Sequence, residues 1–331
     1  LYLRGRHLYQ NRGLAQVAQA VELLKQAVAL DPDFADAWAN LAAANMVKGY
    51  NQEQGYAALY RDGKMAALRA IEIDPDNGFA HAVLGLVHVG EFAWEEAMRE
   101  YDLALRLNPN ETNSLLWKGI VLLSLGYADQ ATAMFKQAER LDPVFTNVQN
   151  WLASAYRVKG DVENMRRHIN NLHRLDPDFP LSNFISFVPD SGDLDAAEEL
   201  LRAEDIKSIG TDVLVVAVFS ALRDPGRKEV AVKTLLTNEN LAEAGDLAPY
   251  LWKIGAIDET IANFHQLFER GRGLRATNSL QIFWDDFNRQ QLSDPTVTEF
   301  FKSIGMVAYW RKHGDPDYCR VDGANVECGD P

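Results

Sequence analysis

The sequence predicts an all-α fold in which helix-turn-helix units stack into a right-handed superhelix, an α-solenoid. A tripeptide of Leu or Ile, then Asp or Asn, then Pro occurs at five places, and its successive prolines are 43, 34, 34 and 34 residues apart: Pro32, Pro75, Pro109, Pro143 and Pro177. Apolar residues between the prolines recur at spacings of three and four, as on a helix that faces a core. With 47% hydrophobic and 24% charged residues, the chain can bury such a core. A nearly constant period of this length is typical of stacked helical repeats.

The prolines divide residues 1–177 into five units, because the residue before a proline disfavours the α conformation and so ends a helix. The first unit has a degenerate first helix. The second contains nine extra residues around 51–60, which we interpret as a lengthened second helix. Small and aromatic residues recur at matching places in the third and fourth units: Leu84, Gly85, Ala97, Tyr101, Ala104 and Pro109, then Gly119, Gly126, Ala131, Phe135, Ala138 and Pro143.

These residues resemble the tetratricopeptide repeat family, whose 34-residue unit prefers Trp, Leu, Gly, Tyr, Ala, Phe, Ala and Pro at fixed positions. The resemblance covers residues 1–177 and implies a binding scaffold that works without catalysis and without a cofactor. Its helix pairs would form a groove lined mainly by the first helix of each unit.

Beyond Pro177 the period loosens, and we expect degenerate helical pairs over residues 178–275. Gly192, Ala197 and Leu201 fit a shortened sixth unit. Two further pairs are expected over 211–237, broken at 224–226, and over 246–270, broken at Gly255. Residues 276–331 are expected to hold a helix near 278–288, a start signal at 293–295, a helix over 298–312 and a loop-like tail.

The tail resembles the end of a family of bacterial signalling proteins, through Tyr309-Trp310-Arg311, Gly314, Pro316-Asp317-Tyr318-Cys319 and Cys328. That family joins such repeats to a winged-helix DNA-binding domain or a class III adenylate cyclase domain, often across a membrane span. Neither domain is visible here. Because the chain begins at Leu1 and not at Met, we expect a fragment or a processed form. The resemblance favours the periplasmic side of a membrane-attached protein over the cytoplasm.

The two cysteines, Cys319 and Cys328, lie nine residues apart in the tail. As a disulfide they would stabilise this loop by about 2 to 3 kcal/mol and indicate an oxidising compartment. The alternative is two reduced thiols. A zinc site is not expected, because His313 is the only other candidate ligand nearby.

Charge and motifs exclude several functions. The formal net charge of −14 argues against nucleic acid, which needs clustered basic residues. The longest apolar run, 213–219, is too short for a bilayer, which takes about 20 residues. We interpret His81 and His88 as packing residues, and the basic stripe with the acidic pairs as solvated surface: Arg166, Arg167, His168, His173 and Arg174; Glu95-Glu96, Glu198-Glu199 and Asp285-Asp286. No phosphate loop or metalloprotease motif is present in the sequence.

The family's groove positions, the second, fifth, ninth and twelfth of each first helix, carry over to sixteen residues. They are Asp36, Ala39, Ala43, Met46, Phe79, Ala82, Leu86, Val89, Asn113, Leu116, Ile120, Leu123, Asn147, Asn150, Ser154 and Arg157. Most are apolar, so we expect a protein or peptide partner with apolar anchors. The last four form a polar ladder suited to an extended peptide or a carboxylate. The alternative is that these side chains pack against the opposite wall or the C-terminal helices.

Four functions follow, in decreasing order of support. The first is the sensory or regulatory module of a bacterial signalling protein. The second is a stand-alone assembly scaffold. An RNA-binding helical repeat would need basic groove positions that are absent. A hydrolase within residues 178–331 has no recognisable motif.

Overall fold

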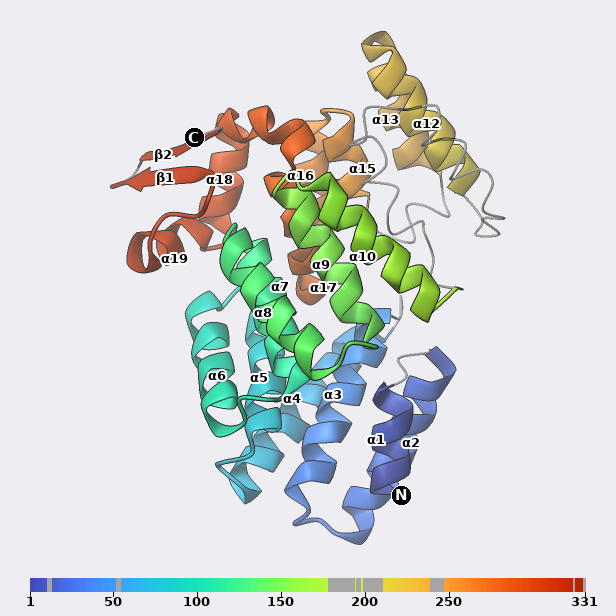
Figure 1. Cartoon of the computed structure of the whole chain (residues 1–331), viewed down its shortest axis with the longest axis vertical. Coiled ribbons are helices and arrows are strands. Elements are labelled where there is room, and N and C mark those ends of the chain that lie inside the picture. The colour runs from blue at the N-terminus through green and yellow to red at the C-terminus, as the bar shows by residue number, and fades with distance from the viewer. Residues whose placement is uncertain are drawn as a thin grey trace. The chain divides into compact units, whose positions relative to one another are not determined.

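The computed structural model describes residues 1–10, 14–51, 55–177, 211–238, 247–323 and 325–329, together with residues 194 and 198. Over these residues the chain is helical apart from one short hairpin, and helices adjacent in sequence pack side by side (Figure 1). The predicted all-α solenoid of paired helices is therefore confirmed. The expected sixth unit, with Gly192, Ala197 and Leu201, lies outside the described residues. No helix in the described ranges combines the length and apolar character needed to cross a bilayer.

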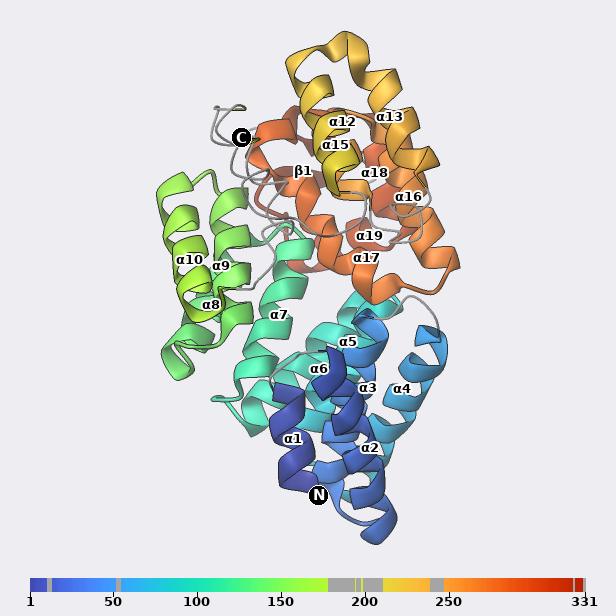
Figure 2. The same ribbon diagram turned by 90° about the vertical axis from the view of Figure 1, so that its right-hand side faces the viewer.

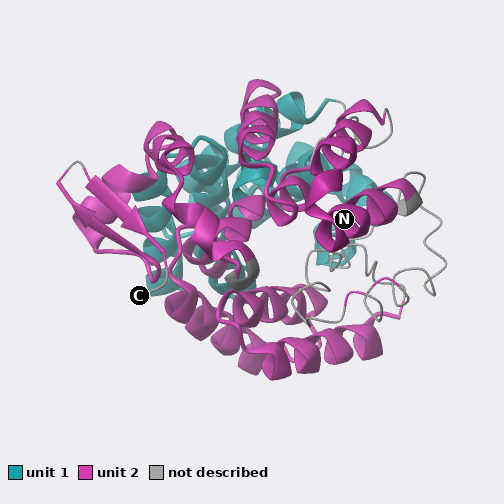
Figure 3. Ribbon diagram, turned by 90° about the horizontal axis from the view of Figure 1, so that it is seen from above, with its two compact units in different colours: residues 1–118, 271–277 teal, residues 119–270, 278–331 magenta. Residues whose placement is uncertain are grey.

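The chain divides into two compact units, which Figure 3 shows in separate colours. Unit 1 comprises Leu1–Lys118 and Gly271–Thr277, and unit 2 comprises Gly119–Arg270 and Asn278–Pro331. The end of the five regular repeats, residue 177, thus lies inside unit 2. The C-terminal segment 276–331 is shared between the units.

Unit 1 is built from three helix pairs, seen side by side in Figures 1 and 2. They are α1 (Tyr2–Gln10) with α2 (Leu14–Leu30), α3 (Ala35–Asn51) with α4 (Tyr56–Ile73), and α5 (Gly78–Gly90) with α6 (Trp94–Leu107). Helix α7 (Thr112–Ser124) begins in unit 1, and α17 (Gly273–Ser279) contributes most of its length. Helices α3 and α4 have 17 and 18 residues, against 13 and 14 in α5 and α6. The extra residues thus lengthen both helices of the second unit, and not only its second one.

The residue before each proline ends its helix in the same way. Asp74, Asn108, Asp142 and Asp176 leave the helical conformation, with φ from −135° to −142° and ψ from 87° to 96°. Each donates its backbone N–H to the carbonyl four residues earlier, which satisfies one carbonyl acceptor of the last helical turn. The proline period is therefore a period of helix ends.

A left-handed residue recurs at the turn within the third, fourth and fifth units. Gly126 has φ +90° and Gly160 has φ +69°, whereas the third unit places Phe92 there with φ +55°. These three positions are 34 residues apart. At Gly126 a Cβ would lie 2.9 Å from a Pro316 ring carbon, so glycine is required for space as well as conformation.

Unit 2 continues the repeats and then departs from them. The pairs are α8 (Ala128–Leu141) after α7, and α9 (Thr146–Val158) with α10 (Val162–Leu175). The described remainder consists of α12 (Thr211–Arg223), η3 (Pro225–Arg227), α13 (Lys228–Thr237), α15 (Ala248–Lys253), α16 (Ile257–Glu269), η4 (Leu280–Trp284), η5 (Asp286–Ser293), α18 (Pro295–Ser303), α19 (Met306–His313), β1 (Cys319–Asp322) and β2 (Asn325–Cys328).

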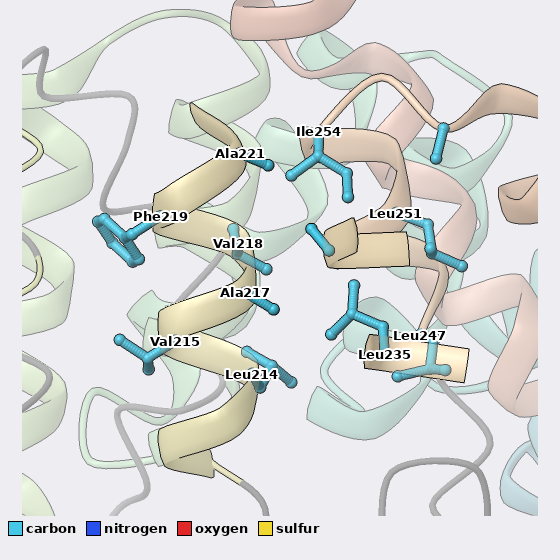
Figure 4. Close-up of a cluster of buried hydrophobic side chains, with 12 residues drawn as sticks. Leu214, Val215, Ala217, Val218, Phe219, Ala221, Leu235, Leu247, Leu251 and Ile254 are labelled. Carbon is cyan, nitrogen blue, oxygen red and sulfur yellow. The ribbon is translucent and has the colours of Figure 1, made fainter. Parts of the chain in front are cut away.

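Two apolar clusters hold the later part of unit 2. In the first, Leu214, Val218 and Ala221 of α12 point toward Leu251 and Ile254 (Figure 4). The second is aromatic and stacks side chains from α16, η4, α18 and α19: Phe264, Phe283, Trp284, Phe300, Phe301 and Trp310. Because such ring pairs add about 0.5–1.5 kcal/mol each beyond their area, this cluster is a main source of stability for the irregular elements.

Three local predictions for the C-terminal segment are wrong. The helix expected over 298–312 is interrupted at Gly305, whose φ of +76° separates α18 from α19. The helix expected near 278–288 consists mainly of 3-10 turns, which the aromatic packing of η4 holds in place. The loop-like tail contains an antiparallel hairpin that pairs Cys319 with Cys328.

Candidate functional site

The sixteen predicted groove positions fall into two groups by exposure. Eleven are at most 8% exposed: Ala39, Ala43, Met46, Ala82, Leu86, Val89, Leu116, Ile120, Leu123, Ser154 and Arg157. Five keep accessible surface: Asp36, Phe79, Asn113, Asn147 and Asn150. The apolar positions therefore offer a partner little surface, and the accessible positions are polar except for Phe79.

Packing inside unit 1 explains part of this burial. Ala39 lies in a small cluster with Ala70 and Ala80. Met46 faces α4 where that helix has Gly63, and a Cβ there would lie 3.0 Å from the Met46 sulfur. Ala39 and Met46 thus pack the first helix of the second repeat on its own second helix, and Ala39 also packs on the first helix of the third repeat.

The accessible part of unit 1 begins at Asp36, in the first turn of α3. Its carboxylate accepts a hydrogen bond of 2.8 Å from the Asn77 side chain, and its backbone carbonyl accepts one from Asn40. Asn77 is fixed in turn, because it caps α5 by accepting from the Ala80 N–H at 2.9 Å. Burial and the nearby Asp36 charge raise the pKa of Tyr2. Asp36 thus presents an oriented carboxylate on an exposed helix turn.

Phe79 lies two residues after Asn77, in the first turn of α5, and is half-buried. Its ring contacts Tyr9 at 6.5 Å and stacks with Trp117 at 5.8 Å, measured between ring centroids. Tyr9 and Trp117 are themselves buried. Phe79 is therefore a held aromatic ring that retains an accessible edge or face.

The start of α7 completes this surface. Glu111 accepts from both the backbone N–H and the hydroxyl of Ser114, which caps the helix, and its other oxygen accepts from the Asn113 amide at 3.1 Å. We call Asp36, Asn77, Phe79, Glu111 and Asn113 the inner-face site. Asn77 is buried and supports Asp36, so the site offers a partner two carboxylates, one amide and one aromatic ring.

In unit 2 the last residue of the predicted polar ladder, Arg157, is buried and already paired. Arg157 is 3% exposed and forms an ion pair with Asp285 of the same chain. Asp285 also accepts from the Lys253 ammonium at 3.3 Å, and all three side chains are buried. Arg157 does bind a carboxylate, as the ladder suggested, but that carboxylate is its own chain's. The interpretation of Asp285 as surface charge is wrong, because η4 carries it onto α9.

The C-terminal segment occupies further backbone groups of the repeats in unit 2. Trp284 donates its indole N–H to the Ser124 carbonyl and Trp310 donates to the Leu125 carbonyl, each at 2.9 Å. Both carbonyls belong to the C-terminal end of α7, where helix acceptors lack intrahelical partners. The alternative in which groove residues pack against the chain's own C-terminal helices thus describes this part of unit 2.

Two family models match the repeats. One described as a TPR repeat matches residues 9–49, and one described as a tetratricopeptide repeat matches residues 112–145. The second match begins with α7 and ends just before α9, which is one helix pair of 34 residues. The chain contains tetratricopeptide repeats.

Known proteins are similar to this chain at low identity. Anaphase-promoting complex subunit 3 of Schizosaccharomyces pombe is 24% identical over 178 residues. The match covers 52% of this chain and 26% of that protein, so this chain spans about a quarter of its relative's length. Yeast Tom70 is similar at 18% identity, with a TM-score of 0.45 and coverage of 87% of this chain and 62% of that one. Pseudomonas aeruginosa pilF is similar at 17% identity, with a TM-score of 0.44 and coverage of 61% and 97%.

The histidines of the tetratricopeptide repeats have local partners. His81 contacts Glu100 at 2.6 Å and the Pro75 carbonyl at 3.0 Å, and the Glu100 hydrogen bond raises its pKa. His168 is buried, stacks on Tyr156 and contacts Gln149 at 2.8 Å, and burial lowers its pKa. His168 is therefore buried and is not part of the exposed basic stripe that the sequence predicted. Within the described residues, no group of His, Cys, Asp and Glu is arranged to hold a metal ion.

Sequence reasoning did not anticipate a shallow pocket in unit 1. Its lining includes Tyr50, Tyr56 and Tyr60 around the lengthened α3–α4 pair, and Arg272 from the segment before α17, in a hollow of about 280 Å³ that is open to solvent. The Arg272 guanidinium lies 5.4 Å from the centre of the Tyr56 ring. The extra residues of the second repeat were the available signal, since they supply Tyr56 and Tyr60.

Proposed function

We propose that this chain is a protein-binding scaffold that holds an extended segment of its partner on the inner-face site of unit 1, and that it performs no catalysis. One observation carries the proposal: the accessible groove positions of unit 1 are a carboxylate, an aromatic ring and an amide, each fixed by a neighbour. Amide side chains can both donate to and accept from a peptide backbone. Fixed groups of this kind lose little entropy when they bind.

The chemistry of the inner-face site selects the partner's composition. Asp36 and Glu111 place two carboxylates on the surface, which favours a Lys or Arg side chain. Phe79 accepts one apolar or cationic side chain against its ring. The partner segment is therefore extended and basic, with one apolar anchor. The several anchors expected from the sequence would need positions that are buried.

A displayed library of random peptides, panned against the whole chain, tests this proposal. The wild type should enrich basic peptides, and Asp36→Lys should lose at least tenfold in affinity for them, because it replaces attraction by repulsion. Asp62→Lys is the matched control: it makes the same charge change on α4, where Asp62 is half exposed. Equal loss in both variants, or enrichment that survives Asp36→Lys together with Phe79→Ala, would contradict the proposal.

We further propose that the scaffold is the regulatory module of a bacterial signalling protein with a winged-helix or adenylate cyclase domain. The resemblance of the tail supports this, and its residues act together: Trp310, Gly314, Asp317 and Tyr318 all contact the repeats of unit 2. Reading the gene upstream of the Leu1 codon tests it. An output domain in the same reading frame would support the proposal, and a start codon directly before Leu1 would leave a stand-alone scaffold.

A further inference from the structure

The segment 314–318, between α19 and β1, lies on two neighbouring turns of unit 2. At the turn before α8, the Tyr127 hydroxyl donates to the Gly314 carbonyl at 2.6 Å, and the Asp317 N–H donates to the Gly126 carbonyl at 3.0 Å. The Asp317 carboxylate accepts from the Ala128 N–H at 2.6 Å and so caps α8. We call the described residues 314–323 and 325–329, this segment with its hairpin, the clasp.

The clasp also contacts the C-terminal end of α9. The Tyr318 hydroxyl donates to the Val158 carbonyl at 3.2 Å, and Arg289 donates to the same carbonyl at 3.0 Å. The Arg289 guanidinium lies 3.7 Å from the centre of the Tyr318 ring. Two consecutive repeats are thereby joined by one short segment.

Cys319, the residue directly after Tyr318, forms a disulfide with Cys328. It links the two strands at the base of the hairpin, where the Gly329 N–H also donates to the Tyr318 carbonyl. A hairpin of two strands is at best marginally stable by itself. The bridge therefore holds Tyr318 and its neighbours in the geometry that meets α9.

We propose that this disulfide is a redox-controlled fastener: its reduction releases the clasp from the turns before α8 and after α9. The proposal is independent of the inner-face site, which lies in unit 1. The reductant is a dithiol. Its thiolate attacks the sulfur of Cys328, because Cys319 is 3% exposed and Cys328 is half-buried.

The exchange then balances in two steps. The first forms a mixed disulfide at Cys328 and expels Cys319 as a thiolate, which takes up a proton. The second thiol of the reductant attacks that mixed disulfide and releases Cys328. Two electrons and two protons pass from the dithiol, which becomes a disulfide, to the protein, which gains two thiols.

Release uncovers polar groups of the repeats. The Ala128 N–H at the start of α8 loses its carboxylate acceptor, and the Gly126 and Val158 carbonyls lose donors. The turns of two successive repeats then become available together. Opening and closing of the clasp would thereby follow the redox state of the compartment.

Hydrogen exchange on the whole chain, oxidised and after treatment with dithiothreitol, tests the proposal. The Ala128 and Asp317 amides are the reporters, because each donates across the contact between clasp and repeats. Their exchange should rise about 100-fold on reduction, the change expected when a cross-link of this loop length is lost. Amides of α5 and α6 in unit 1 serve as internal controls and should not change.

The double variant Cys319→Ser, Cys328→Ser should exchange like the reduced protein and ignore dithiothreitol. If this variant does not fold, the comparison of oxidised and reduced wild type stands alone. Equal protection of Ala128 and Asp317 in both redox states would overturn the proposal, as would a disulfide that dithiothreitol reduces only after denaturation.

Discussion

Removing the Asp285 carboxylate should destabilise unit 2 severely. Arg157 and Lys253 are each 3% exposed and both contact this carboxylate. Asp285→Ala leaves their two positive charges buried beside a small cavity. Breaking a buried ion pair from one side costs about 3–5 kcal/mol, which is a large fraction of the about 5–15 kcal/mol that stabilises a typical domain.

Urea denaturation followed by far-ultraviolet circular dichroism measures this cost. With a slope of about 2 kcal/mol per molar urea, the midpoint of unit 2 should fall by about 1.5–2.5 M. The urea midpoint of Asp285→Asn should fall less, because the amide oxygen still accepts one hydrogen bond. Asp62→Ala, which removes an exposed carboxylate, should change the free energy of unfolding by less than about 0.5 kcal/mol.

A triple variant separates charge burial from packing. Arg157→Met, Lys253→Met and Asp285→Leu together replace the buried charges by apolar side chains of similar volume, and should recover most of the stability that Asp285→Ala loses. A loss below about 1 kcal/mol in Asp285→Ala would refute the reasoning that this carboxylate neutralises two buried cations.

Three further predictions follow. Gly126→Ala should cost at least about 1–2 kcal/mol, because φ is +90° and a Cβ would meet a proline ring; thermal melting of unit 2 checks it, and an unchanged midpoint would contradict it. The stability that His81 contributes is present below pH 6.5 and is lost as the pH rises through its raised pKa. The stability that His168 contributes is present above pH 6.5 and is lost as the pH falls through its lowered pKa. An NMR titration in which both rings share one midpoint would contradict this. Asp317→Ala should cost about 1 kcal/mol through loss of the cap on the Ala128 N–H, and equal urea midpoints for this variant and the wild type would count against the cap. Burial raises the Asp317 pKa, so the wild type should lose part of its stability as the pH rises through that pKa; wild-type urea midpoints that do not fall over this range would contradict the raised pKa.

The repeat architecture could be predicted because its signals are local. A proline acts on the residue before it, and Asp74, Asn108, Asp142 and Asp176 all end their helices with the same backbone geometry. Helix pairs separated by short turns then pack with their neighbours. For this reason the proline-marked ends of the regular units could be predicted. The break in the helix expected over 298–312 could not, because Gly305 makes it through a left-handed backbone that glycine permits but does not require.

The accessible site could be predicted only in part. Asp36, Phe79 and Asn113 were among the expected groove residues, since position in the repeat places them on the first helix. Their supports, Asn77 and Glu111, are helix caps, and the polar side chain preceding each helix was the signal that could have identified them.

Sequence alone determined the stacked helix pairs of this chain, because a helix period and a helix end are each encoded within a few residues. Tetratricopeptide repeat models match two stretches of these helix pairs. Tertiary structure decided which groove positions stay accessible. Arg157 and Asp285 are 128 residues apart, and no periodicity relates them. Burial of a charge depends on whether an opposite charge arrives from a distant segment, and that is settled only when the irregular C-terminal elements fold onto the repeats of unit 2.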